Sequence, residues 1–154
     1  FIIGAGVAGL SAIATAHALG AKVYANDVRE VAREQVESMG AEFVPVDAAG
    51  LAGEGVGGYA ADMGQDFLAA QRATYARILP EMDVVISTAM LPNRAAPVLI
   101  TNEMLQSMQR GSVVVDLAAQ TGGNCAATEQ DQAVVTPSGV TVVGETNYPS
   151  AMPA

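Results

Sequence analysis

The chain has 154 residues, of which 51% are hydrophobic and only 15% charged, and its formal net charge at pH 7 is −9. A chain of this length is expected to form one domain with a hydrophobic core of its own. Its seven lysines and arginines are dispersed along an acidic chain. This argues against nucleic-acid binding, which needs clustered basic side chains. The single cysteine, Cys125, excludes an internal disulfide.

The first nine residues predict a dinucleotide site. A short apolar strand ending at residue 3 runs directly into a G-x-G-x-x-G motif at positions 4–9, and a helix is predicted over 7–19. Gly4 permits the tight turn, Gly6 lets a pyrophosphate approach the backbone, and Gly9 lets the helix pack closely on the strand. Asp27, at the end of the second predicted strand, is placed to accept hydrogen bonds from a ribose.

A membrane span is the alternative for the same stretch, because residues 1–21 form one uncharged run and the mean hydropathy is +0.31. The glycine spacing and the lack of a preceding basic segment argue against it, so we expect a soluble domain. The three-residue first strand, and the end of the chain at 149–154 without a closing element, predict that 1–154 is cut at both ends from a larger protein.

In chain order, the pattern predicts a strand over 21–26, a helix over 28–39 and a strand over 42–46. Residues 47–63 have no periodicity and carry five glycines between positions 50 and 58. Such a segment is either an idle linker or a lid over a ligand. Tyr59, which stands on a flexible stem of two glycines, and Met63 are the side chains within it that could close over a flat ligand.

The second half predicts a helix over 65–79, a strand over 83–87, a helix over about 101–109, a strand over 112–116 and a hairpin around 134–143 that supplies a sixth strand. Helices between strands indicate a Rossmann-like, doubly wound parallel α/β sheet of about six strands. Gln71 falls within the apolar face of its helix, where it is either a core residue bonded to backbone or a ligand contact. Thr88, Ala89 and Met90 leave the carboxyl end of a strand, where such sheets bind ligands.

Two further side chains bear on the cofactor. Asp27 favours NAD(H), because a carboxylate repels a 2′-phosphate, whereas Arg29 could hold that phosphate or lie in solvent. Asp116 ends a strand at the ligand edge, and we interpret it as a capping or turn aspartate. The sequence shows no catalytic triad, no paired carboxylates and no metal-ligand pattern, so we predict neither catalytic nor metal-binding residues.

Several strings resemble one family, the alpha subunit of proton-translocating NAD(P) transhydrogenase, in its NAD(H)-binding domain; alanine dehydrogenase is a looser match. They cover nearly the whole chain in order and include IGAGVAGL at 3–10, DVR at 27–29, GGYA at 57–60, STAMLP at 87–92, GSVVVDLAA at 111–119 and GGNC at 122–125. The chain departs from the family at Met90, where leucine is usual, and after Tyr59, where a lysine and a glutamate are usual.

The resemblance implies a mechanism without an enzyme acid or base. NADH would pass hydride directly to NADP+ on an NADP(H)-binding domain, coupled to proton movement through a membrane domain. It implies cofactor contacts at Val7, Asp27, Val28, Arg29, Gly58 and Met90, a Gln or Glu near the cofactor at position 71, and a loop at 47–63 that closes on the nucleotide.

The family also suggests a homodimer of the alpha subunit, as a peripheral domain on the cytoplasmic face of the bacterial inner membrane or on the mitochondrial matrix side. Two alternatives stay open: an alanine-dehydrogenase-like enzyme, which would normally lack the long loop, and a non-catalytic NAD-sensing module.

Overall fold

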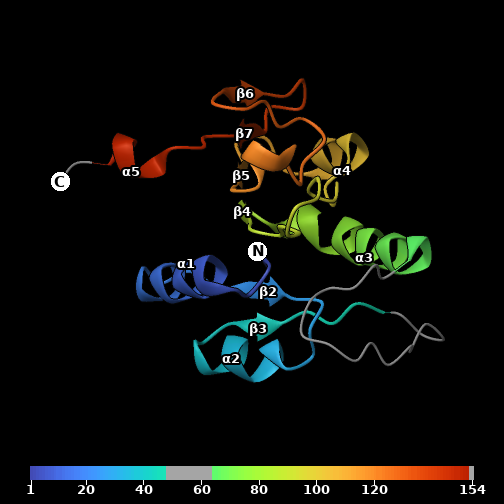
Figure 1. The fold of residues 1–154 in the computed structure, drawn as a ribbon, viewed down its shortest axis with the longest axis vertical. Helices are drawn as coiled ribbons and strands as arrows, with labels where there is room; N and C mark the ends of the chain where they lie inside the picture. Colours follow the sequence, from blue (N-terminus) through green and yellow to red (C-terminus); the bar gives the residue numbers. More distant parts are fainter. Residues whose placement is uncertain (48–63, 153–154) are drawn as a thin grey trace.

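The computed structural model describes residues 1–47 and 64–152. Within them, a single seven-stranded sheet runs through the molecule in the order β3-β2-β1-β4-β5-β7-β6 (Figure 1). All neighbours pair in parallel except β6 and β7, which are antiparallel. The strands are β1 (Ile2–Ile3), β2 (Tyr24–Asn26), β3 (Glu42–Phe43), β4 (Val84–Ser87), β5 (Val113–Asp116), β6 (Ala133–Val135) and β7 (Thr141–Val143).

This order confirms the Rossmann-like, doubly wound sheet. The chain builds outward from β1 to β3 on one side, then returns to β4 beside β1 and builds outward on the other. β7 takes the sixth place that we expected for residues 140–143. The first run of the hairpin, β6, adds an antiparallel edge strand that brings the sheet to seven.

The helices cover both faces of the sheet (Figure 1). They are α1 (Val7–Ala18), α2 (Ala32–Ser38), α3 (Gln65–Ile78), α4 (Asn102–Ser107) and α5 (Tyr148–Ala151), with 3-10 turns η1 (Leu79–Glu81) and η2 (Ala119–Thr121). The two residues of β1 contribute to two different hydrophobic clusters, one on each face of the sheet, because successive side chains of a strand point to opposite faces. Ile2 packs with Ile13 of α1 and Val36 of α2, whereas Ile3 belongs to the larger core with Tyr75 of α3 and Leu105 of α4.

Several predicted boundaries were wrong. The helix predicted over 28–39 begins only at Ala32, because the Asp27 carboxylate accepts a hydrogen bond from the Arg29 backbone N–H at 2.8 Å and holds the chain in a turn first. The strands predicted over 21–26 and 42–46 shrink to three and two residues, since β2 pairs with β1 at two positions and β3 pairs with β2 at two. The chain end predicted to lack a closing element forms the short helix α5.

Three helix ends show common local capping arrangements. Thr101 caps α4, its hydroxyl oxygen accepting from the Met104 backbone N–H. Gly20 and Gly40 both have φ of +88°, the left-handed conformation expected after helices α1 and α2. In the described part of the chain, no helix has the length and apolar character needed to cross a membrane.

Candidate functional site

A cleft of about 560 Å³ lies where the sheet order reverses, beyond the carboxyl ends of β1, β2 and β4. Open α/β sheets bind ligands at this switch point, because neighbouring connections there leave toward opposite faces. The first wall is the turn after β1 with the end of β2, the second wall is the loop after β4, and the start of α3 forms the floor between them. The lining residues are Ile3, Gly4, Gly6, Asn26, Asp27, Val28, Arg29, Gly64, Gln65, Phe67, Leu68, Gln71, Tyr75, Thr88, Ala89, Met90, Leu91, Pro92, Pro97 and Leu99.

The three motif glycines are needed for three different reasons. Gly4 has φ of +91°, and a Cβ there would lie 2.5 Å from the Thr88 hydroxyl. A Cβ on Gly9 would lie 1.8 Å from the Gly4 carbonyl oxygen, so α1 could not pack against the turn. Gly6 is different, because a Cβ there would meet no heavy atom within 4 Å in the described structure. Since Gly6 also lines the cleft, its missing side chain keeps space open in the cleft itself.

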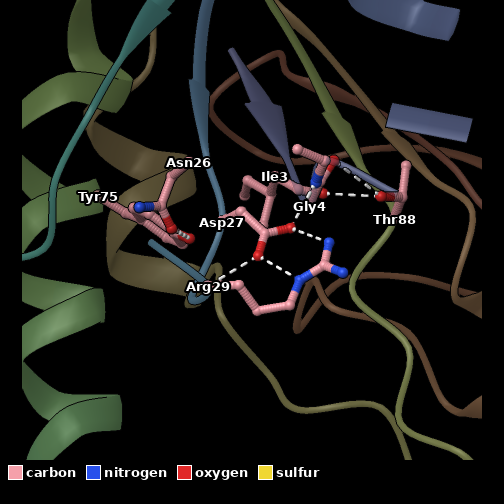
Figure 2. A network of polar contacts seen from close by, with 8 residues as sticks. Ile3, Gly4, Asn26, Asp27, Arg29, Tyr75 and Thr88 are labelled. Atoms are coloured by element: carbon pink, nitrogen blue, oxygen red, sulfur yellow. Dashed lines mark hydrogen bonds and ion pairs between the residues drawn. The ribbon is translucent and has the colours of Figure 1, made fainter. Parts of the chain in front are cut away.

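Thr88 ties the second wall to the glycine turn (Figure 2). Its backbone N–H donates to the Ile3 carbonyl at 2.8 Å, and its hydroxyl lies 3.1 and 3.2 Å from the carbonyl oxygens of Ile3 and Gly4. The side chain predicted to contact a ligand therefore also bonds the two walls together.

Asp27 is the charged centre of the first wall, and its side chain is only 6% exposed. One carboxylate oxygen accepts from the Arg29 backbone N–H and Nε at 2.8 and 2.9 Å, and the other from the Ala5 N–H and Arg29 Nη2 at 2.8 and 3.0 Å (Figure 2). Burial disfavours the charged form, but the hydrogen bonds from Arg29 and Ala5 outweigh it and hold the carboxyl pKa below its ordinary value. Arg29 is thus neither free nor simply solvated.

Gln71 lies on the floor of the cleft, 94% buried, and bonds to a side chain rather than to backbone. Its Nε2 donates to the Tyr75 hydroxyl at 2.9 Å, which donates in turn to Asn26 Oδ1 at 2.6 Å. Figure 2 shows Tyr75 and Asn26 facing each other beside Asp27. Burial raises the pKa of the Tyr75 hydroxyl, so it stays protonated. Neither partner was predicted from the sequence as a site residue, although Tyr75 stands one helical turn after Gln71 and Asn26 directly precedes Asp27.

The second wall is held by Asn124, a residue far from it along the chain. Its Nδ2 donates to the carbonyl oxygens of Ala89 and Pro97 at 2.8 and 2.9 Å, and its Oδ1 accepts from the Ser87 hydroxyl at 2.7 Å. Asp116 then holds Asn124, accepting from its backbone N–H at 2.7 Å. Asp116 also accepts from three further donors, the Ala118 and Cys125 N–H groups and the Thr128 hydroxyl. Asp116 is thus the turn aspartate that we expected, and it is fully buried.

The predicted site residues separate into three groups. Those that the structure brings together around the cleft are Gly4, Gly6, Asp27, Val28, Arg29, Gln71, Thr88, Ala89 and Met90. Val7 and Gly9 do not line it: Val7 opens α1 and is 92% exposed, and Gly9 lies beneath the turn. Gly58 and Tyr59 lie outside the described residues. The apolar side chains of the floor and second wall were not predicted as site residues, among them Phe67, Leu68, Leu91 and Leu99.

Comparison with known proteins agrees with this architecture. The family described as "Alanine dehydrogenase/PNT, C-terminal domain" matches residues 1–154. The chain belongs to this family. It is 53% identical over 154 residues to NAD(P) transhydrogenase subunit alpha of Cereibacter sphaeroides, covering 99% of this chain and 29% of that protein. It is 49% identical over 152 residues to NAD(P) transhydrogenase subunit alpha of Haemophilus influenzae, covering 99% of this chain and 30% of that one.

Two solved structures of this family place the fold. A transhydrogenase from Sinorhizobium meliloti superposes with a TM-score of 0.79 at 45% identity, over 96% of this chain and 38% of that chain. An L-alanine dehydrogenase superposes with a TM-score of 0.70 at 26% identity, over 97% of this chain and 37% of that chain. The resemblance to transhydrogenase alpha subunits is therefore confirmed. The chain spans less than half the length of each of these relatives.

Proposed function

We propose that this family member binds NAD(H) in the cleft and presents it for hydride transfer to NADP+ held on a partner domain. The observation that carries the proposal is the open space at Gly6. Nothing in the described protein needs a glycine there, whereas Gly4 and Gly9 are required by their neighbours. A pyrophosphate beside the turn does need one, because any side chain would hold it away from the backbone.

The start of α1 suits the same ligand. No side chain caps the helix within the described structure, and its first turn carries no acidic residue. The N–H groups of a helix N-terminus attract anionic oxygens through their unsatisfied donors and the helix dipole. In an acidic chain, these groups rather than a basic cluster supply the attraction for phosphate.

The Asp27–Arg29 pair supports a preference for NAD(H) over NADP(H). Each carboxylate oxygen of Asp27 already accepts two hydrogen bonds, so a ribose would have to take the place of the Arg29 guanidinium, whose side chain is 39% exposed and borders solvent. A ribose hydroxyl can donate to the carboxylate in its place. A 2′-phosphate at neutral pH is an acceptor and an anion, so its approach would leave the nearly buried carboxylate facing a like charge.

The bound dinucleotide supplies the hydride, and the chain supplies position. Gly4 and Gly6 shape the turn for the pyrophosphate, Asp27 holds the ribose, and the loop after β4 forms the wall opposite. The resemblance adds proposed contacts at Val7, Val28, Arg29 and Met90, and at Gly58 outside the described residues. Tyr59, also outside them, is the proposed aromatic contact. Reactions of this kind are accelerated mainly by holding donor and acceptor in register.

The proposal extends to the assembly. We infer that residues 1–154 of this chain are the NAD(H)-binding domain of a longer subunit. We further infer that the subunit forms a homodimer, and that its partners are an NADP(H)-binding domain and a proton-translocating membrane domain. It would then lie at the cytoplasmic face of a bacterial inner membrane or on the matrix side of a mitochondrial one. The names and lengths of the relatives support a longer transhydrogenase subunit, and the homodimer, the membrane domain and the side of the membrane rest on the family resemblance alone.

The deciding experiment measures binding and transfer separately. NADH and NADPH are titrated against the full-length protein by the change in nicotinamide fluorescence, and hydride transfer to an NADP+ analogue is followed in the presence of membranes that hold the complete assembly. We expect tighter binding of NADH and transfer from it. Equal or tighter binding of NADPH would contradict the cofactor assignment. Oxidation of L-alanine without transfer would instead favour the alanine dehydrogenase branch, which the superposition on L-alanine dehydrogenase keeps as the second candidate.

A further inference from the structure

A buried chain of hydrogen bonds runs from the end of β3 to the floor of the cleft. It starts at the Val44 backbone carbonyl, which accepts from Asn26 Nδ2 at 2.7 Å. It continues through Asn26 Oδ1 and the Tyr75 hydroxyl at 2.6 Å, and ends at Gln71 Nε2, 2.9 Å from that hydroxyl. Asn26, Gln71 and Tyr75 are each at least 94% buried.

The direction of every bond in this chain is determined by its first member. A backbone carbonyl can only accept, so the amide nitrogen of Asn26 must face Val44 and its oxygen must face Tyr75. An amide oxygen also only accepts, so the single hydroxyl proton of Tyr75 points at Asn26. The Tyr75 oxygen is then left to accept, and Gln71 must present its NH2 group to it.

This leaves the Gln71 carbonyl oxygen for the cleft. It accepts no hydrogen bond from the described residues, although the side chain lines the cleft and is only 6% exposed. Because this oxygen faces the cleft, a ligand that fills the cleft displaces the solvent there, and only a hydrogen-bond donor on the ligand replaces what the oxygen loses. An acceptor at the same place would face the carbonyl with like partial charge.

We propose that Tyr75 and Asn26 are positioning residues that hold the Gln71 amide with its carbonyl toward the ligand, so that the cleft selects a base with an exocyclic amino group, as in adenine. This inference rests on the proposed NAD(H) function. Asn26 directly precedes Asp27, which we propose holds the adenosine ribose, and the base is bonded to that ribose. The neighbouring floor is apolar, with Phe67 and Leu68, and suits a flat ring.

The test compares NADH with its hypoxanthine analogue, in which a carbonyl oxygen replaces the adenine amino group. Dissociation constants are measured by titration with the full-length protein. We expect the analogue to bind about tenfold more weakly, the scale for one lost hydrogen bond that leaves a buried acceptor unpaired. Tyr75→Phe releases the Gln71 amide to turn over and donate to the analogue, so the two dissociation constants should approach each other to within about twofold.

Thr74→Val is the matched control. Thr74 precedes Tyr75 on α3 and is also buried. Its hydroxyl donates a hydrogen bond to the Ala70 carbonyl at 3.0 Å, and it does not line this cleft. It should keep the tenfold preference even if it lowers stability as much as Tyr75→Phe. If Tyr75→Phe does not fold, Gln71→Met tests the same idea. It removes the acceptor oxygen from a side chain of similar length, and should abolish the preference for NADH over the hypoxanthine analogue.

Other outcomes are decisive against the idea. Equal binding of the two nucleotides by the unmodified protein would overturn it, as would a Tyr75→Phe or Gln71→Met variant that keeps the tenfold ratio. Binding of neither nucleotide would instead contradict the proposed function on which the inference rests. The failure of the selectivity and the failure of the cofactor assignment are thus distinguishable.

Discussion

The two walls of the cleft are built in contrasting ways. The first wall, the turn after β1 with the end of β2, draws its contacts from residues 3–29, and its polar bonds join Asp27 to Ala5 and Arg29. The second wall, the loop after β4, is held by Asn124, which lies 35 residues from Ala89 and 27 from Pro97 along the chain. The first wall therefore forms within one strand-helix-strand unit, whereas the second needs residues from after β4 and from after β5 to come together.

The contrast predicts which substitutions separate binding from folding. Changes to the first wall that meet only the ligand should remove affinity from a folded protein. Changes to the second wall should lower stability and affinity together, because the same buried polar groups support both.

Gly6→Val should have the largest effect on binding. The added side chain fills open space in the cleft rather than clashing with the protein, so the fold should survive while NADH affinity falls at least about a hundredfold. The check is titration combined with thermal unfolding. Gly9→Val is the contrasting control, since its Cβ would collide with the Gly4 carbonyl and should destabilise the fold itself. Near-normal NADH affinity in a folded Gly6→Val protein would show that the pyrophosphate does not bind at the glycine turn.

Asn124→Ala should be the most damaging change to the second wall. It leaves the Ala89 and Pro97 carbonyls and the Ser87 hydroxyl without their partner, and we expect a loss of about 2–4 kcal/mol in the free energy of unfolding. NADH should bind more weakly because the loop is no longer held in place. Denaturant unfolding and titration of the same sample provide both numbers, and unchanged stability would show that the loop holds itself.

Asp27→Ala should weaken NADH binding by about 1–3 kcal/mol, the scale for hydrogen bonds to a charged group. It also frees the Arg29 guanidinium to meet a 2′-phosphate, so the preference for NADH over NADPH should narrow. Arg29→Ala is the complementary variant and should widen the preference by leaving the carboxylate bare. The measurement is the ratio of the two dissociation constants, and the idea fails if both variants shift that ratio in the same direction.

Two buried serines test the support of the second wall by a smaller change, the loss of one hydrogen bond each. Ser87 and Ser112 are both buried beside sheet strands and each donates one side-chain hydrogen bond, to Asn124 Oδ1 and to the Met82 carbonyl respectively. Each alanine substitution should cost about 1 kcal/mol of stability. Only Ser87→Ala should also weaken NADH binding, by a few-fold, because only Ser87 bonds to the residue that holds the cleft loop. Equal effects on binding would mean that general loss of stability explains both.

The smallest effect expected is on pH dependence. Because the pKa of Asp27 is lowered below its ordinary value of 3.8 in the folded protein, the ionised pair with Arg29 stabilises the fold above that pH. This contribution is lost as the pH falls below 3.8 through the folded-state pKa. The difference in unfolding free energy between the unmodified protein and Asp27→Asn should therefore shrink in acid, as denaturant titrations from neutral pH down through that transition would show. A difference that persists at the acid end would assign it to geometry rather than charge.

The amino-acid sequence by itself determined the order of the elements and the first wall. The glycine spacing and the acid at position 27 form a contiguous pattern within one strand-helix-strand unit, and the helix-ending glycines are decided by local sterics. The resemblance to the transhydrogenase alpha subunits was likewise predicted from short contiguous stretches of sequence. The predicted bounds of α2 were less accurate, because the Asp27 side chain binds the Arg29 backbone N–H and delays the start of that helix.

Only the tertiary structure decided how the other polar groups are paired. Asn124, Tyr75 and Asn26 looked like ordinary residues in their own segments, and their partners come from strands and loops far along the chain. Packing brings these groups out of water, and once buried each must find a partner of the opposite hydrogen-bonding type. The orientation of Gln71 in the cleft follows from that requirement, which reaches through Tyr75 and Asn26 to Val44 and has no signal in any single stretch of sequence.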